Sequence, residues 1–126
     1  MRAVDTNVLV RLVVRDDPAQ VARAEAFVGG GAWVSTVVLA ETAWTLTSVY
    51  HLKPAAIAVV VAGFLDNAHL ALQDADAVTT ALEEFKHHPG LGFTDCLVLE
   101  LARKAGHLPL GTFDRPLGKL DGANAV

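Results

Sequence analysis

Short apolar runs alternate along this chain with longer stretches in which apolar residues recur at helical spacing. We expect strands in the short runs, at residues 2–4, 32–35, 69–74, 108–113 and 124–126. We expect helices in the longer stretches, at residues 7–14, 18–28, 36–51, 54–65, 75–88 and 94–107, with a short helix or turn at 114–120. This alternation favours one α/β domain over residues 1–126, with a mostly parallel central sheet.

The helix expected at 18–28 shows how side chains mark the ends of an element. Asp17 can cap its N-terminus, Pro18 suits the first helical position, and Gln20 sits where a capping-box partner would reach back. The glycines at 29–31 then end the helix.

Composition indicates a globular chain with a weakly acidic surface. The chain has 126 residues, 52% of them hydrophobic and 19% charged, which is enough to bury a core. Its formal net charge of −4 does not by itself indicate a nucleic-acid partner. If the substrate is a nucleic acid, a local basic patch or bound cations must offset the acidic residues.

Cysteine content and hydropathy favour a cytoplasmic protein. Cys96 is the only cysteine, so no intrachain disulfide can form, and a reducing compartment is the simplest expectation. No apolar leader segment follows Met1. The most apolar run, at 54–65, is shorter than the roughly 20 residues that a membrane-spanning helix needs. We therefore expect no membrane segment and interpret this run as a buried or partner-facing helix.

Four acidic residues occupy positions that solubility does not explain. Asp5 follows the first expected strand and Asp114 follows the strand at 108–113. Because the carboxyl ends of parallel strands share one edge of a sheet, neighbouring strands would aim both carboxylates into one crevice. Glu41 and Asp95 lie within expected helices and have apolar residues one turn away. We expect both to border an apolar face, where an unpaired charge is unfavourable.

Each acid also has a purely structural explanation. Asp5, Asp95 and Asp114 could cap the helices that follow them, and Glu41 could point into solvent. As a set, however, the acids fit divalent-metal catalysis better. Mg²⁺ and Mn²⁺ prefer carboxylate and water oxygens, and a bound ion activates water and neutralises a reacting phosphate.

Four stretches in order resemble the PIN domain, and more closely its VapC-type toxin branch. They are VDTNVLVRLVVRDD at 4–17, AETAW at 40–44, GFTDCLVLELARKAG at 92–106 and GTFDRPLGKL at 111–120. The resemblance covers nearly the whole chain. It implies a single PIN domain with a PIN-like three-layer α/β/α sandwich and a short, mostly parallel central sheet. It also implies a Mg²⁺- or Mn²⁺-dependent endoribonuclease that acts as the toxin of a toxin–antitoxin pair.

The resemblance implies a role for each matching residue. The catalytic residues would be Asp5, Glu41, Asp95 and Asp114. Asp5, Asp95 and Asp114 would hold the metal, and Glu41 would ligate it or orient the attacking water. Thr112 and Asn7 would hold the carboxylates by hydrogen bonds. From their closeness to the acids in sequence, Arg11, Arg15 and Arg115 are candidates for binding RNA phosphates, although each could also be a solvated surface residue.

The expected partners are an RNA substrate, an antitoxin protein and a second copy of the chain. We expect the antitoxin to place a basic residue in the acidic pocket, and the run at 54–65 to form a homodimer contact. Two alternatives remain open: a receiver-type, Mg²⁺-binding phosphoacceptor domain, and a PIN scaffold used only for binding. Trp33 and Trp44 fit core or interface positions better than base-stacking positions. Cys96 has no histidine partner nearby in sequence, so a nucleophilic role is not expected.

Overall fold

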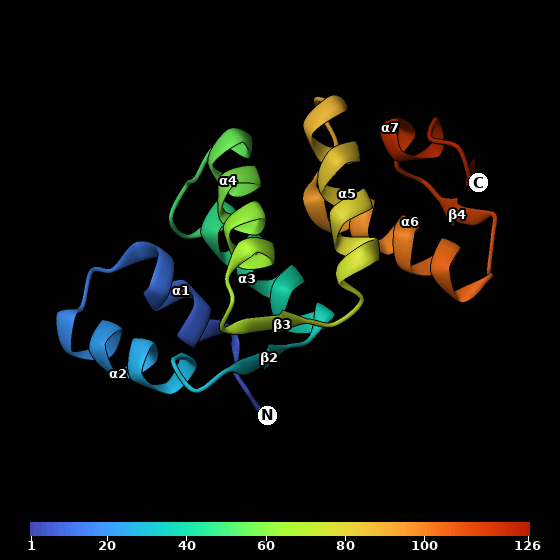
Figure 1. The fold of residues 1–126 in the computed structure, drawn as a ribbon. Coiled ribbons are helices and arrows are strands. Elements are labelled where there is room, and N and C mark those ends of the chain that lie inside the picture. The colour runs from blue at the N-terminus through green and yellow to red at the C-terminus, as the bar shows by residue number, and fades with distance from the viewer. The chain divides into compact units, whose positions relative to one another are not determined.

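All expected strands and helices form in the computed structural model, which describes residues 1–126 (Figure 1). The chain divides into an N-terminal unit, Met1–Ala75, and a C-terminal unit, Asp76–Val126. Seven helices and short parallel sheets confirm the predicted α/β fold class. No helix combines the length and apolar character needed to cross a membrane.

The N-terminal unit contains a three-stranded parallel sheet and four helices. Its elements are β1 (Arg2–Ala3), α1 (Thr6–Val14), α2 (Pro18–Val28), β2 (Ala32–Val34), α3 (Thr36–Ser48), α4 (Pro54–Asp66) and β3 (Leu70–Leu72). The strand order is β1-β2-β3, with Ala3 opposite Trp33 and Trp33 opposite Ala71. Helix α1 packs against α2 and α3, and α3 packs against α4.

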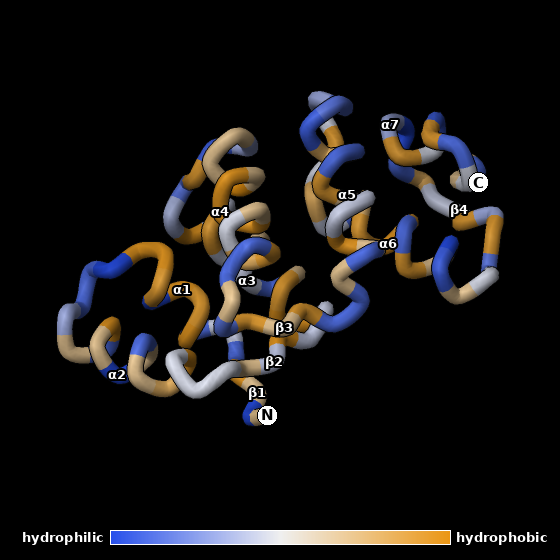
Figure 2. The backbone as a smooth tube through the Cα atoms, viewed as in Figure 1, coloured by the Kyte–Doolittle hydropathy of each residue, from blue (hydrophilic) through white to orange (hydrophobic).

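The core of this unit follows from the periodicity of its helices and central strand. Ala32 and Val34 on β2 are buried on either side of the more exposed Trp33, as alternation in a strand requires. The core is completed by apolar side chains from the helices, among them Leu9, Val10, Leu39, Leu46, Val61 and Phe64. In Figure 2 hydrophobic colour runs along much of α1 and α4.

Residues at the N-termini of two helices in this unit cap them by hydrogen bonds, as the sequence predicts for α2. The Asp17 carboxylate accepts a hydrogen bond from the backbone N–H of Gln20 at 3.1 Å, with Pro18 at the first helical position of α2. Helix α3 is capped in the same way by Ser35, whose hydroxyl accepts from the N–H of Val38 at 3.1 Å. This cap helps a segment rich in β-branched residues to begin as a helix.

The C-terminal unit contains a two-stranded parallel sheet and three helices. Its elements are α5 (Ala75–His87), α6 (Phe93–Ala105), β4 (Leu110–Thr112), α7 (Arg115–Gly118) and β5 (Ala123–Ala125). Phe85 of α5 meets Phe93 of α6 edge to face, with ring centroids 6.1 Å apart. Helix α6 ends at Gly106, which adopts a left-handed conformation with φ 82°.

Strand pairing differs from the expectation of one continuous sheet. β4 pairs with β5 in a separate two-stranded sheet, and β1 pairs with β2. The strands that precede Asp5 and Asp114, β1 and β4, therefore belong to different sheets. Helix α3 ends at Ser48 rather than at residue 51, and α6 begins one residue earlier than predicted, at Phe93.

Candidate functional site

Asp5 lies at the junction between β1 and α1. Val4 is buried and fixes the end of the strand, while Asp5 occupies the N-cap position of α1 with extended backbone angles. Its carboxylate is exposed and accepts no hydrogen bond from the helix. The capping explanation for Asp5 is therefore wrong, and the carboxylate is free to bind a ligand.

Glu41 lies on the exposed face of α3, which corrects the expectation that it faces the core. The buried face of the helix consists of Leu39, Thr42, Ala43 and Leu46. Glu41 falls on the opposite side, one turn from Val37 and Trp44, which are themselves exposed. The prediction failed because it took these apolar neighbours for core residues. Exposed in this way, the Glu41 carboxylate makes no hydrogen bond or ion pair within the chain.

Asp95 lies half-buried in the first turn of α6. Its predicted capping alternative is also wrong, because Gly92 occupies the N-cap position and Asp95 comes three residues later. A Cβ added at Gly92 would lie 3.3 Å from Asp95 Oδ2, so the carboxylate folds back over this glycine. Asp95 makes no hydrogen bond or ion pair within the chain. A negative charge here is favoured by the N-terminal end of the helix dipole.

Asp114 is the one acid of the four that has a structural role. Its Oδ1 accepts a hydrogen bond from the N–H of Leu117 at 2.9 Å and so caps α7. Its own backbone N–H donates to Thr112 Oγ1 at 3.0 Å. Thr112 thus holds the backbone of Asp114, and α7 holds one carboxylate oxygen. The second oxygen remains available.

The other predicted site residues differ in whether they already form hydrogen bonds or ion pairs with other side chains. Asn7 is exposed on α1 and makes no hydrogen bond to Asp5. Arg11 pairs with Asp16 and donates to the Tyr50 hydroxyl at 3.3 Å. Arg15 pairs with Glu25 at 2.5 Å. Of the three arginines proposed for phosphate binding, Arg115 alone is exposed and unpaired.

The four predicted catalytic acids are divided between the two units. Asp5 and Glu41 belong to the N-terminal unit, whereas Asp95 and Asp114 belong to the C-terminal unit. No group of three or more His, Cys, Asp or Glu side chains is arranged to hold a metal ion. The donor chemistry nevertheless fits Mg²⁺ or Mn²⁺, because each acid offers at least one carboxylate oxygen without a hydrogen-bond donor.

A pair of carboxyl groups in the C-terminal unit was not predicted. Burial raises the pKa of Glu84 to about 7, assisted by a hydrogen bond to Glu100 and by the charge of Glu100. Glu100 is only 5% exposed and accepts from Arg103 Nε at 3.1 Å. The sequence signal was the spacing of Glu100 within the buried stripe of α6. Nearby, burial raises the pKa of the Cys96 thiol to about 12, which agrees with the absence of a nucleophilic role.

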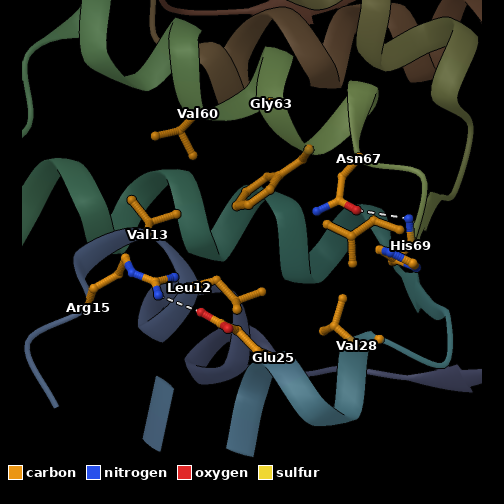
Figure 3. Close-up of a pocket in the computed structure, with 12 residues that line it drawn as sticks. Leu12, Val13, Arg15, Glu25, Val28, Val60, Gly63, Asn67 and His69 are labelled. Atoms are coloured by element: carbon orange, nitrogen blue, oxygen red, sulfur yellow. Dashed lines mark hydrogen bonds and ion pairs between the residues drawn. The ribbon is translucent and has the colours of Figure 1, made fainter. Parts of the chain in front are cut away.

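An apolar cavity of about 550 Å³ opens between α1, α2 and α4 in the N-terminal unit (Figure 3). Apolar side chains form most of its wall: Leu12, Val13, Val28, Val60, Phe64 and Leu70. The Arg15–Glu25 ion pair lies at one side, and Asn67 and His69 lie at the other. Its size and lining are typical of a site that receives an apolar ligand or side chains.

Comparison with known proteins identifies the family. The family model for the PIN domain matches residues 2–123. No significant match was found among curated proteins or among solved structures. PIN domains are generally nucleases, and they usually bind Mg²⁺ or Mn²⁺. Since the match covers almost the entire sequence, the chain belongs to the PIN domain family.

Proposed function

We propose that this protein is a Mg²⁺- or Mn²⁺-dependent endoribonuclease that acts as the toxin of a toxin–antitoxin pair. The proposal rests on one observation about the acids that match the family motifs, which is that most of their carboxylate oxygens have no bonding partner. Asp5, Glu41 and Asp95 have no partner within the chain. Most other carboxylates are engaged, for example Asp16 with Arg11 and Glu25 with Arg15. Carboxylates that the fold leaves unpartnered are available to bind cations.

Each candidate residue has a proposed role in hydrolysis. Asp5, Asp95 and Asp114 would hold the metal through carboxylate oxygens, and Glu41 would ligate it or orient the attacking water. When bound, the metal would supply an activated water and neutralise charge on the phosphate. Thr112 and the N–H of Leu117 hold Asp114 in place, so that one of its carboxylate oxygens stays without a hydrogen bond.

Cleavage of labelled single-stranded RNA tests this proposal. The wild-type protein should cleave it with Mg²⁺ or Mn²⁺ and lose activity with chelator. Asp5→Asn and Asp95→Asn should each lower the cleavage rate by at least about 100-fold, because each removes a charged metal ligand. Asp66→Asn is the matched control, since Asp66 is exposed and unpartnered but lies outside the family motifs.

Two results would contradict the nuclease assignment. Activity in Asp5→Asn or Asp95→Asn equal to that of Asp66→Asn would exclude a role for the acids. RNA binding by wild type without any cleavage would favour the PIN scaffold that only binds. The match to the PIN domain family counts against the receiver-type alternative. Only labelling of the protein by a small phosphodonor would support that alternative again.

The cavity between α1, α2 and α4 is a candidate binding site for the proposed antitoxin. An amphipathic segment could place apolar side chains against Val28, Val60 and Phe64. A basic residue of the same antitoxin would pair with the unpartnered acids and so exclude metal and RNA together. A cytoplasmic location follows from this proposal, because the RNA substrate and the unpaired Cys96 both fit that compartment.

A second copy of the chain is the other proposed partner. The α4 run is less exposed than its composition suggested, since Ile57, Val61 and Phe64 are buried within the N-terminal unit. Val59 is 72% exposed on the same helix, and Val60 is half-buried beside it. This remaining apolar surface supports a homodimer contact through α4.

A further inference from the structure

Two aromatic rings are exposed beside candidate catalytic acids. Trp44 is 64% exposed, which excludes the core position considered for it from the sequence, and lies three residues from Glu41 on the outward face of α3. Phe113 is 86% exposed and lies between Thr112 and Asp114. The first belongs to the N-terminal unit and the second to the C-terminal unit. Each ring therefore accompanies an acid of its own unit.

Neither ring lies in the core of the protein. The buried face of α3 is made by other side chains, and neither Trp44 nor Phe113 takes part in a ring–ring or cation–π contact. The backbone around Phe113 is nevertheless restrained, because the residues on both sides of it are joined by the hydrogen bond from the Asp114 N–H to Thr112 Oγ1. An exposed ring on a restrained backbone is suited to contact a flat ligand.

The charges of the chain leave few cations for gripping phosphates. Five of the ten Lys and Arg side chains are already in ion pairs: Arg11, Arg15, Lys86, Arg103 and Lys104. Arg2 lies over the Phe27 ring, 3.7 Å from its centroid. With a formal net charge of −4, the chain gains from a source of RNA affinity that does not depend on charge. Stacking of bases on aromatic rings is such a source.

We propose that Trp44, three residues from Glu41, and Phe113, adjacent to Asp114, each stack on a base of single-stranded RNA. The proposal rests on the nuclease function proposed above, because that function requires RNA to approach Glu41 and Asp114. Bases within a duplex stack on each other and hide their faces, so duplex RNA is a poor ligand for these rings.

Paired substitutions separate stacking from general apolar contact. Trp44→Leu and Phe113→Leu keep an apolar side chain but remove the aromatic ring, whereas Trp44→Phe and Phe113→Tyr keep a ring. The Kd for a fluorescent single-stranded RNA is measured by anisotropy with chelator present, so that no cleavage occurs. Each leucine variant should bind about ten-fold more weakly, and each aromatic variant within about two-fold of wild type. Val49→Ser, at the far end of α3, is the matched control for loss of an exposed apolar side chain.

Tryptophan fluorescence and abasic RNA test the contact directly. Trp33→Phe leaves Trp44 as the sole tryptophan, and RNA should quench its emission. An RNA with abasic nucleotides at every position keeps the phosphates but removes the bases, so it should neither quench this emission nor distinguish leucine from aromatic variants. Equal binding by leucine and aromatic variants, or equal quenching by abasic RNA, would overturn the proposal. Conversion of a dimer to a monomer by Trp44→Leu, with RNA binding unchanged, would instead assign this face to a second copy.

The outcomes also separate this inference from the nuclease proposal. If wild type cleaves RNA and the leucine variants bind and cleave equally well, the stacking inference fails and the nuclease proposal stands. If wild type binds single-stranded RNA through the two rings but never cleaves it, stacking stands and the nuclease proposal fails. If wild type neither binds nor cleaves, both fail. Equal melting temperatures of all variants confirm that losses of binding are not losses of folding.

Discussion

At the scale of single residues, the contact between Glu84 and Glu100 couples protonation to folding. Glu84 Oε1 is buried and receives no hydrogen bond from another group. Burial and the neighbouring Glu100 raise the pKa of Glu84 to about 7, while the charge of Arg103 acts in the opposite direction. In the unfolded chain the Glu84 carboxyl regains an ordinary pKa of about 4.3. The folded state therefore holds this proton more tightly than the unfolded state does.

This difference predicts how stability depends on pH. The protonated pair stabilises the fold fully below the unfolded pKa of about 4.3, and that stabilisation is lost as pH rises through about 7. Glu84→Gln keeps a hydrogen-bond donor without the charge. Between pH 5 and pH 8, wild type should lose about 1 kcal/mol relative to this variant, or roughly 4 °C in Tm, since solvent access screens part of the effect. Thermal unfolding followed by circular dichroism at both pH values measures the difference. An equal change in Tm between pH 5 and pH 8 for wild type and Glu84→Gln would contradict the prediction.

At the scale of single elements, Asp114 is both the N-cap residue of α7 and a proposed metal ligand. Asn is as good an N-cap as Asp, whereas Ala cannot accept the hydrogen bond from Leu117. Asp114→Ala should therefore lose about 1 kcal/mol of stability together with RNA cleavage. Asp114→Asn should keep wild-type stability and still lose cleavage, because the metal-binding charge is gone. Denaturant unfolding and RNA cleavage of both variants measure the two effects. Cleavage retained by Asp114→Asn would leave Asp114 a capping residue only.

The elements were predictable where local chemistry decides them. Asp17, Pro18 and the glycines after α2 mark its ends, and each acts in the structure as its chemistry requires. Positions decided by tertiary packing were less predictable. Glu41 was expected to border an apolar face because apolar residues lie one turn away, yet Val37 and Trp44 are exposed and the core takes the opposite face of α3. A single helix with apolar residues on both faces does not reveal which face is buried.

The site residues show the same division between local and long-range information. Sequence motifs identified Asp5 and Asp95 as candidates, but not that their carboxylates lack partners, which depends on where the surrounding side chains lie. The pairing of β4 with β5 involves segments about ten residues apart, and no pattern in either strand specifies its neighbour. The spacing of Glu100 within α6 indicated its burial, but nothing in the local sequence indicated its contact with Glu84 of another helix.

At the scale of the whole molecule, the apolar surface left on α4 predicts self-association. Val59 is exposed on a helix whose other large apolar side chains are buried or half-buried, so Val59→Asp can be made without disturbing the core. We expect light scattering to give twice the chain mass for wild type at micromolar concentration and the single mass for Val59→Asp, because a charge buried at the contact is unfavourable. Val49→Ser, which removes an exposed valine at the end of α3, should remain dimeric. If wild type has the mass of one chain, the α4 contact does not form. If Val59→Asp is still a dimer, the two copies associate through another surface, and the exposed face of α3 around Trp44 becomes the first to test.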